Sequence, residues 1–188
     1  FKQKTAYEIK ECDWSSDVCS SDLDTIAVAR WALDTGLTEP GRMVVMGGSA
    51  GGFTALSAVA SAPGLFAAVA TSYPVSDLAD LPVNSHRFEQ HYTDLLVGPW
   101  PQAEPTYRER SPSRWPERFV GTPVLVVHGA DDPVVSVQQS IAFVDEVRRA
   151  GGDAALHIYA GEGHGFRDPV NQLDEYRRLE EFLSAHCR

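Results

Sequence analysis

Short apolar runs alternate with longer helical segments along most of the chain. Four of these runs have the continuous apolar character of buried strands, at residues 42–46, 65–71, 123–128 and 154–159. The segments between and after them carry alanine-rich or helically spaced apolar residues. Strands that alternate with helices are typical of an α/β domain built on a parallel sheet. We therefore predict an α/β fold with about four parallel strands and flanking helices.

Capping and turn residues predict where the helices begin and end. Asp24 is placed to N-cap a helix that runs to about Asp34, and Gly36 follows as a terminating residue. An alanine-rich helix is expected after the first strand. Between the third and fourth strands, Ser136 and Gln139 have the spacing of a capping box at the start of another helix.

The last predicted helix begins near Asp168-Pro169, since proline suits the first turn of a helix. Its apolar residues recur at helical spacing and predict one stripe that faces the core. The stripe consists of Val170, Leu173, Tyr176, Leu179 and Leu183.

Residues 73–122 break this alternation. They hold seven of the chain's 12 prolines and show no strand pattern. We expect short helices that lie over the ends of the strands, where α/β enzymes bind ligands. The aromatic side chains there either shape a substrate pocket or pack as ordinary apolar groups; they are Tyr73, Trp100 and Trp115.

Composition narrows the class of protein. The chain has 188 residues, of which 43% are hydrophobic, and these values suit a globular domain with a sizeable core. Its net charge of −10 argues against a nucleic-acid partner, which would require a clustered basic surface. No run approaches the roughly 18 apolar residues of a membrane span. No His, Asp or Cys cluster has the spacing of metal ligands, so we expect neither a metal nor a cofactor.

The first 23 residues differ in composition from the rest. They contain all three lysines and no arginine, whereas the 13 arginines all follow residue 24. Lysine codons are AT-rich and arginine codons are mostly GC-rich, which points to two coding origins. The segment also resembles the conceptual translation of an indexed sequencing-library adapter, with DWSSDVCSSDL as its inner part. We therefore expect a non-native leader at residues 1–23, with a native polar tail as the alternative, and an N-terminally truncated native domain at residues 24–188.

This assignment removes two of the three cysteines from the native count. Cys12 and Cys19 fall in the leader and are not interpreted as metal ligands. Cys187 alone implies no disulfide framework. The leader carries no information on targeting, and a cytoplasmic location is the working expectation.

A glycine-rich turn follows the first strand and carries the first candidate catalytic residue. Gly47-Gly48-Ser49-Ala50-Gly51 fits the pattern G-x-S-x-G between a strand and a helix. There the serine hydroxyl is exposed beside a helix N-terminus, whose free N–H groups stabilise developing negative charge. Ser49 is therefore a candidate nucleophile, and the Ala50 N–H is a candidate oxyanion donor. The alternative is an ordinary glycine-rich turn in which Ser49 caps the helix.

Two later loops supply candidates for an acid and a base. Asp131 and Asp132 follow the third strand, and each could orient a catalytic histidine or serve as a turn residue. His164 lies between glycines after the fourth strand, where its ring is accessible enough to act as a general base. Serine, acid and histidine, in that order after successive strands, follow the chain order expected of an α/β-hydrolase.

Other polar residues near these motifs are given structural roles. His128 ends the third strand and His157 lies within the fourth, so both are expected to be packed or hydrogen-bonded core groups. For His86 and His91, in the proline-rich segment, a surface role is favoured over a place in the site. Glu162 is expected to be a loop carboxylate that accepts backbone hydrogen bonds.

The three motifs together resemble the catalytic domain of the prolyl oligopeptidase family of serine peptidases. The matching segments are GGSAGG, HGADDPVV, GEGHGFRDP, SYPVSDL and HRFEQHYTDLLVGP. The resemblance covers residues 24–188 and is strongest to the branch of acylaminoacyl peptidases and dipeptidyl aminopeptidases. It implies an α/β-hydrolase fold, of which this chain holds the C-terminal part only. The family pattern H-G-x-x-D-x-x-V implies that Asp132, rather than Asp131, is the acid.

The resemblance also implies a function. The expected activity is a serine peptidase that cleaves short peptides through Ser49, Asp132 and His164 and an acyl-enzyme intermediate. A carboxylesterase or other acyl hydrolase on the same fold is the alternative, since fold and triad do not set the acyl substrate, and a non-catalytic module or inactive fragment is the third possibility. Family members also carry a β-propeller, about four earlier strands and a loop with a second oxyanion donor. This chain lacks those parts, so we expect it to be poorly soluble and nearly inactive on its own.

Overall fold

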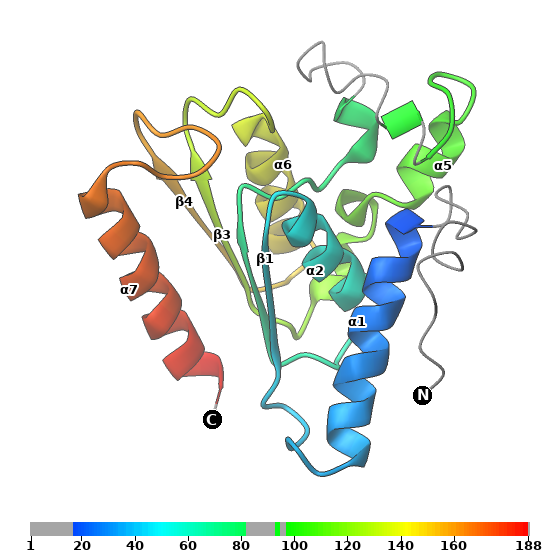
Figure 1. The fold of residues 1–188 in the computed structure, drawn as a ribbon, viewed down its shortest axis with the longest axis vertical. Helices are drawn as coiled ribbons and strands as arrows, with labels where there is room; N and C mark the ends of the chain where they lie inside the picture. Colours follow the sequence, from blue (N-terminus) through cyan, green and yellow to red (C-terminus); the bar gives the residue numbers. More distant parts are fainter. Residues whose placement is uncertain (1–16, 82–92, 95–96, 188) are drawn as a thin grey trace, which may run out of the picture.

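Four parallel strands form the centre of the molecule (Figure 1). The computed structural model describes residues 17–81, 93–94 and 97–187. Each strand pairs in parallel with the next one along the chain. The strands, in order across the sheet, are β1 (Val44–Gly48), β2 (Ala68–Ser72), β3 (Val124–Gly129) and β4 (Ala154–Tyr159). This confirms the predicted α/β fold with a parallel sheet.

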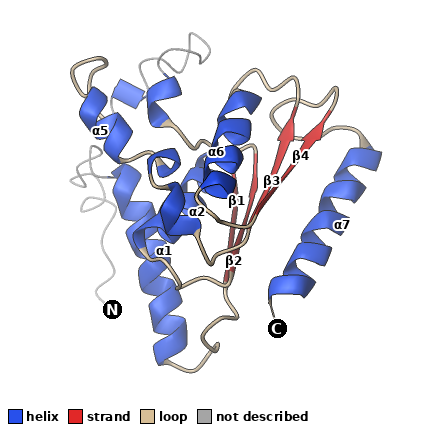
Figure 2. Ribbon diagram, turned by 180° about the vertical axis from the view of Figure 1, so that it is seen from behind, coloured by secondary structure: helices blue, strands red, loops and turns tan. Residues whose placement is uncertain are grey.

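Helices cover both faces of the sheet. The long helices are α1 (Asp17–Asp34), α2 (Ala50–Ser61), α6 (Val137–Arg149) and α7 (Pro169–His186). Figures 1 and 2 show α1, α2 and α6 on one face and α7 on the other. The molecule therefore has three layers, the arrangement typical of a parallel sheet connected by helices.

The largest apolar core lies between the sheet and the layer of α1, α2 and α6. All six residues of β3 are buried, and α2 and α6 add the fully buried Leu56 and Phe143. Phe143 meets Phe119 edge to face, with ring centroids 5.1 Å apart. A smaller cluster lies under α7, where Tyr159 packs in a group with Leu179.

The segment between β2 and β3 forms short helices and no strand within its described residues. These helices are η2 (Leu78–Asp80), α5 (Glu104–Glu109), η3 (Pro112–Arg114) and η4 (Pro116–Phe119). Tyr107 of α5 shares a buried cluster with Phe53, at the start of α2, and Val135, just after β3. The segment therefore covers the carboxyl-terminal end of the sheet on the α2 side, as predicted. His86 and His91 lie outside the described residues.

The predicted start of the first helix is wrong. The helix begins at Asp17 rather than after an N-cap at Asp24. The turn before Asp24 stays helical because Asp22 is buried against α2, where its carboxylate accepts a hydrogen bond from Ser61 Oγ at 3.1 Å. The predicted boundary between leader and native domain therefore lies inside one continuous helix.

The strands match the predicted apolar runs to within a few residues. The fourth strand occupies the predicted residues. The first begins at Val44 and extends to Gly48 instead of ending at Met46, because both glycines of the following turn continue the pairing with β2.

The predicted capping box of α6 is only half correct. Ser136 caps the helix by accepting a hydrogen bond from the Gln138 N–H at 3.3 Å. Gln139 does not reach back to it. The Gln139 side chain is buried, and its Oε1 accepts hydrogen bonds from the N–H groups of Ser76 and Asp77, both at 3.0 Å. A tertiary contact has therefore replaced the local one.

The predicted core stripe of α7 is mostly wrong. Val170, Leu173 and Tyr176 are 72%, 51% and 67% exposed. Leu179 packs on the cluster under the helix, together with Phe182, which the stripe did not include. The reason is geometric: α7 packs mainly on β2 and β3, so only a narrow line of its side chains meets the sheet.

Candidate active site

The turn between β1 and α2 holds Ser49 in a strained conformation. Its backbone has φ 55° and ψ −123°, which non-glycine residues rarely adopt. Gly52 lets the start of α2 approach the chain after β2, since a Cβ at that position would lie 2.7 Å from Pro74 Cβ. The Ser49 side chain makes no capping hydrogen bond to α2, so the alternative of a helix-capping serine is wrong. The turn has instead the geometry expected of G-x-S-x-G.

The Ser49 hydroxyl points at His164. The distance from Ser49 Oγ to His164 Nε2 is 2.9 Å, and Nδ1 of the same ring lies 2.8 Å from Asp132 Oδ2. Because a carboxylate accepts hydrogen bonds, Nδ1 is the ring nitrogen that carries the hydrogen, and Nε2 is left to accept from the serine hydroxyl. The three predicted residues are therefore joined by one continuous chain of hydrogen bonds.

Asp132, rather than Asp131, reaches the histidine. The Asp132 side chain is fully buried. Its Oδ1 accepts hydrogen bonds from the N–H groups of Val134 and Val135, at 2.8 and 3.0 Å. Asp131 is exposed, and its N–H donates to the loop that carries His164. The loop backbone thus holds Oδ1 of the Asp132 carboxylate, while Oδ2 faces His164.

The loops that carry the acid and the histidine are bound to each other directly. The Asp131 N–H donates to the carbonyl oxygen of Glu162 at 2.9 Å. Gly129, at the end of β3, lies against the backbone of Glu162 and Gly163, where any Cβ would overlap their carbonyl oxygens. Glycine is required for this close approach. The two loops are therefore joined directly to each other, and this contact sets the distance between the Asp132 carboxylate and the His164 ring.

The Glu162 carboxylate anchors the far end of the histidine loop. The residue is only 3% exposed. Its Oε2 accepts a hydrogen bond from the Arg167 N–H at 2.8 Å, and its Oε1 accepts from the Asp168 N–H and the Asn171 side chain, both at 2.9 Å. These donors, Asn171 foremost, lower the pKa of Glu162. The predicted role of this loop carboxylate is confirmed.

Tyr73 forms a wall beside the histidine. Its ring lies 4.6 Å from the His164 ring, centroid to centroid, with the planes tilted by 55°. Like the serine, Tyr73 has a positive φ, of 41°. Of the aromatic residues considered for a pocket, Trp100 instead packs against α5, and Trp115 stacks under Arg118.

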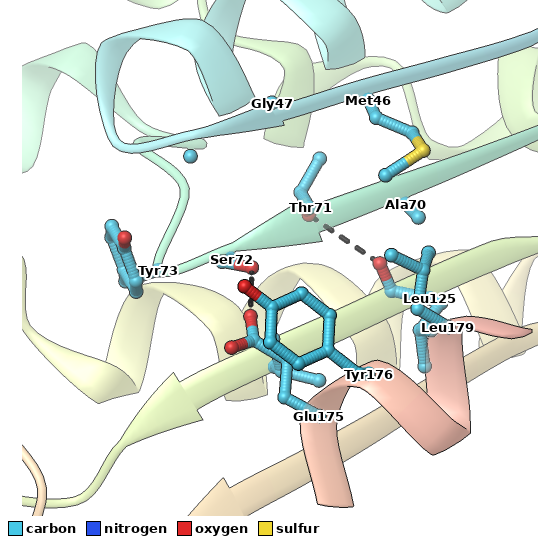
Figure 3. A pocket seen from close by; sticks show the side chains of 12 residues that line it. Met46, Gly47, Ala70, Thr71, Ser72, Tyr73, Leu125, Glu175, Tyr176 and Leu179 are labelled. Carbon is cyan, nitrogen blue, oxygen red and sulfur yellow. Dashed lines mark hydrogen bonds between the residues drawn. The ribbon is translucent and has the colours of Figure 1, made fainter. Parts of the chain in front are cut away.

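A cavity of about 390 Å³ opens next to Tyr73, between the sheet and α7 (Figure 3). Its apolar walls come from Met46, Ala70, Leu125, Val127 and Leu179. Inside it, Ser72 Oγ donates a hydrogen bond to Glu175 Oε1 at 2.6 Å. Ser49 and His164 are not among its lining residues. The cavity therefore borders the site through Tyr73 but lies on the α7 face of the sheet.

Of the other described strand histidines, His128 is the core group that was predicted, whereas His157 is only half-buried. His128 is fully buried and hydrogen-bonded at both ring nitrogens, and burial lowers its pKa. His157 on β4 lies 3.6 Å from the Asp174 carboxylate. Its pKa is also lowered, first by burial and then by the nearby charge of Arg178.

Outside the triad, the described segments hold a free cysteine thiol but no cluster of metal ligands. No group of three or more His, Cys, Asp or Glu side chains in those segments is placed to hold a metal ion. None of the described helices is both long and apolar enough to cross a bilayer. Cys187 is a free, half-buried thiol that lies 3.2 Å from the Arg42 carbonyl oxygen.

Comparison with known proteins places the chain in a family. A model of the prolyl oligopeptidase family matches residues 19–188, and the chain belongs to this family of serine peptidases. It is 28% identical to dipeptidyl peptidase family member 6 of Caenorhabditis elegans, over 85% of this chain and 22% of that protein. It is also 28% identical to dipeptidyl aminopeptidase BIII of Pseudoxanthomonas mexicana, over 87% of this chain and 24% of that protein.

Solved structures show the same relationship. A puromycin-hydrolyzing peptidase of Mycobacterium tuberculosis is 34% identical with a TM-score of 0.85, over 89% of this chain and 25% of that one. A puromycin hydrolase is 36% identical with a TM-score of 0.77, over 85% of this chain and 23% of that one. The chain spans a quarter or less of the length of each of these four relatives. The matched neighbours are α/β-hydrolase-fold peptidases, which agrees with the expected fold class.

Proposed function

We propose that this member of the prolyl oligopeptidase family carries the catalytic triad of a serine peptidase that acts on short peptides. Ser49 is the nucleophile, His164 the general base and acid, and Asp132 the residue that orients His164. The observation that carries the proposal is the chain of hydrogen bonds from Ser49 Oγ through His164 to Asp132, at 2.9 and 2.8 Å. The strained backbone of Ser49 supports it, because such strain is typical of functional sites.

Acylation follows from this geometry. Ser49 Oγ bonds to the carbonyl carbon of the scissile amide while its proton passes to His164 Nε2. The carbonyl oxygen becomes an oxyanion, and the Ala50 N–H at the start of α2 is its proposed hydrogen-bond donor. As the C–N bond breaks, the leaving amine takes the proton from Nε2 and an ester to Ser49 remains. Asp132 accepts the Nδ1 hydrogen throughout and stabilises the imidazolium that forms in between.

Deacylation repeats these steps with water. His164 Nε2 takes a proton from a water molecule whose oxygen bonds to the ester carbon. Collapse of the second oxyanion returns the proton to Ser49 Oγ and releases the acid. The names of the relatives, dipeptidyl peptidase and dipeptidyl aminopeptidase, support short peptides as the substrate class for this chain as well.

A fluorophosphonate probe tests the nucleophile. We expect slow covalent labelling of the chain at Ser49 and none of Ser49→Ala, since removing a triad serine lowers turnover by roughly a millionfold. Ser72→Ala is the matched control, because Ser72 ends the adjacent strand and its hydroxyl bonds Glu175 instead of the triad. Labelling of Ser49→Ala, or its loss in Ser72→Ala, contradicts the assignment. Failure of the wild-type chain to react favours a non-catalytic module.

Paired substrates separate a peptidase from an esterase. We expect a dipeptidyl anilide and the matching ester both to be hydrolysed, very slowly by this chain and at a normal rate by a longer protein that contains it. Hydrolysis of the ester alone would reject the peptidase and leave an acyl hydrolase on the same fold.

A further inference from the structure

A second histidine lies behind the proposed catalytic acid. His128, in β3, has no exposed side-chain surface. Its Nε2 lies 3.0 Å from the Val135 carbonyl oxygen and 3.2 Å from Asp132 Oδ2. Its Nδ1 lies 2.7 Å from Ser140 Oγ in the first turns of α6. Both ring nitrogens therefore have partners, although the proposed chemistry uses neither.

These partners determine which nitrogen of His128 carries a hydrogen. The hydrogen bond of Nε2 goes to the Val135 carbonyl oxygen, and its second neighbour is the Asp132 carboxylate at 3.2 Å; both are acceptors, so Nε2 carries the hydrogen. Nδ1 is then an acceptor, and the Ser140 hydroxyl donates to it. Burial lowers the pKa of His128, which favours the neutral ring with one hydrogen. Ser140 thus selects the tautomer that turns an N–H toward Asp132.

The carboxylate of Asp132 is surrounded by N–H groups. Two backbone donors, from Val134 and Val135, hold Oδ1. Oδ2 lies between two imidazoles, 2.8 Å from His164 Nδ1 and 3.2 Å from His128 Nε2. Without His128, Oδ2 would keep only the bond to His164, and the carboxylate could pivot about Oδ1, which the backbone still holds. A turned carboxylate would no longer keep the His164 ring in line with the serine.

We propose that His128 and Ser140 are positioning residues of the active site. The Ser140 hydroxyl fixes the His128 tautomer, and the Nε2–H of His128 holds Asp132 against His164. The ordered chain thus runs from Ser140 through His128, Asp132 and His164 to Ser49. This inference rests on the proposed function, in which Asp132 orients His164.

The element that carries Ser140 is itself firmly held. Gln139, the preceding residue, is buried and bonds the N–H groups of Ser76 and Asp77 in the segment after β2. Its carbonyl oxygen accepts a further hydrogen bond from Ser76 Oγ at 3.2 Å. The start of α6 therefore connects the proline-rich segment on one side with the triad on the other.

Ser140→Ala is the mildest test, and Ser57→Ala is its matched control. Ser57 is a buried serine of α2 whose hydroxyl has no partner among the described residues. We expect Ser140→Ala to slow fluorophosphonate labelling of Ser49 about tenfold, the effect of one buried hydrogen bond, and Ser57→Ala to leave it unchanged. On a dipeptidyl anilide the loss should appear in kcat and leave KM unaltered. Equal effects of the two substitutions overturn the proposal.

Conservative rescue tests His128 itself. Glutamine can place an N–H near the position of Nε2, whereas leucine fills a similar volume without a donor. At equal folded fraction, checked by circular dichroism, we expect His128→Gln to keep most of the labelling rate and His128→Leu to lose it. Equal rates for the two variants contradict a positioning role.

Nuclear magnetic resonance separates this inference from the proposed function, because it needs no turnover. In the folded chain we expect ¹⁵N shifts of an Nε2–H tautomer for His128, and a deshielded His164 Nδ1 proton that shifts in Ser140→Ala and His128→Leu. An Nδ1–H tautomer, or a His164 proton unchanged in both variants, overturns the inference. If the spectra are as expected but the chain never reacts with the fluorophosphonate probe, it is the proposed function that is refuted.

Discussion

The residues of the site take their positions mainly from backbone contacts. Ser49 keeps a positive φ because glycines on either side let β1 and α2 meet at a sharp turn. Oδ1 of Asp132 keeps its position because two N–H groups of its own loop bind it. His164 sits on a loop whose backbone is bonded to the acid loop at Glu162. The contacts of Asp132 are local in sequence, which is why the motif carried so much of the acid's position, whereas the bond between the acid loop and Glu162 joins two separate loops.

Glu162 makes the histidine loop sensitive to acid. Its donors lower its pKa below the ordinary value for glutamate of about 4.3. A carboxylate with a lowered folded pKa contributes stability that is fully present above the unfolded pKa and is lost as the pH falls through the folded pKa. We therefore expect the urea midpoint of the chain to fall as the pH drops below about 4.3.

Glu162→Gln isolates this effect. The variant should have a lower urea midpoint than the wild type at pH 7. Glutamine replaces one carboxylate oxygen with an NH₂ group, which cannot accept hydrogen bonds from the surrounding N–H donors. The difference should shrink as the pH falls below about 4. Glu180→Gln, at an exposed position of α7, serves as the control and should follow the wild-type curve. Parallel curves for wild type and Glu162→Gln across the acid range contradict this account.

At the scale of elements, α2 depends on one of two neighbouring glycines. A Cβ at Gly52 would lie 2.7 Å from Pro74 Cβ, whereas a Cβ at Gly51 would meet nothing within 4 Å. We expect Gly51→Ala to raise the free energy of unfolding by about 0.5–1 kcal/mol, the helix preference of alanine over glycine. Gly52→Ala should lower it by about 1–3 kcal/mol through overpacking.

Chemical denaturation of the two variants, one residue apart in the same helix, checks this contrast. Labelling by the fluorophosphonate probe should persist in Gly51→Ala and weaken in Gly52→Ala, because Pro74 follows the residue that packs on His164. Equal destabilisation by both alanines would mean that backbone conformation, rather than space beside Pro74, requires glycine here.

The elements could be predicted wherever local pattern decided them. Strand positions followed from continuous apolar runs, and the start of the last helix near Asp168-Pro169 followed from that proline. The start of α1 could not be predicted, since it depends on the contact of Asp22 with Ser61, 39 residues away. Gln139 has the spacing of a capping box, yet its side chain accepts a hydrogen bond from the backbone of a segment that is distant in the sequence. Which face of α7 is buried likewise depends on how the helix crosses the sheet.

The site was predictable to a similar degree. Spacing and chain order identified Ser49 and His164, but the residues alone left Asp131 and Asp132 as competitors until the family pattern separated them. The burial of one carboxylate and the exposure of the other now give the physical reason. His128 was interpreted as a core group, and nothing in its local sequence indicated that Ser140, in the first turns of the next helix, would bond its ring.

At the scale of the whole molecule, the sheet is covered unevenly. β1 lies at one edge, and within the described residues no strand pairs with its outer side. Met46 of that strand is 48% exposed. An unpaired edge strand with exposed apolar side chains is a template for pairing with another chain. We therefore expect the chain to self-associate through β1, and light scattering after size exclusion should show species larger than a monomer.

Met46→Lys tests whether the edge is responsible, because a charge on an edge strand opposes strand pairing. We expect this variant to shift the chain toward the monomer at equal concentration. Leu173→Lys removes a side chain of similar exposure, 51%, from α7, far from the β1 edge in sequence and on a helix that cannot pair as a strand. If exposed apolar surface of any kind caused the association, both lysine substitutions would reduce it equally. If the β1 edge causes it, Met46→Lys acts and Leu173→Lys does not, and a monomeric wild-type chain would exclude both explanations.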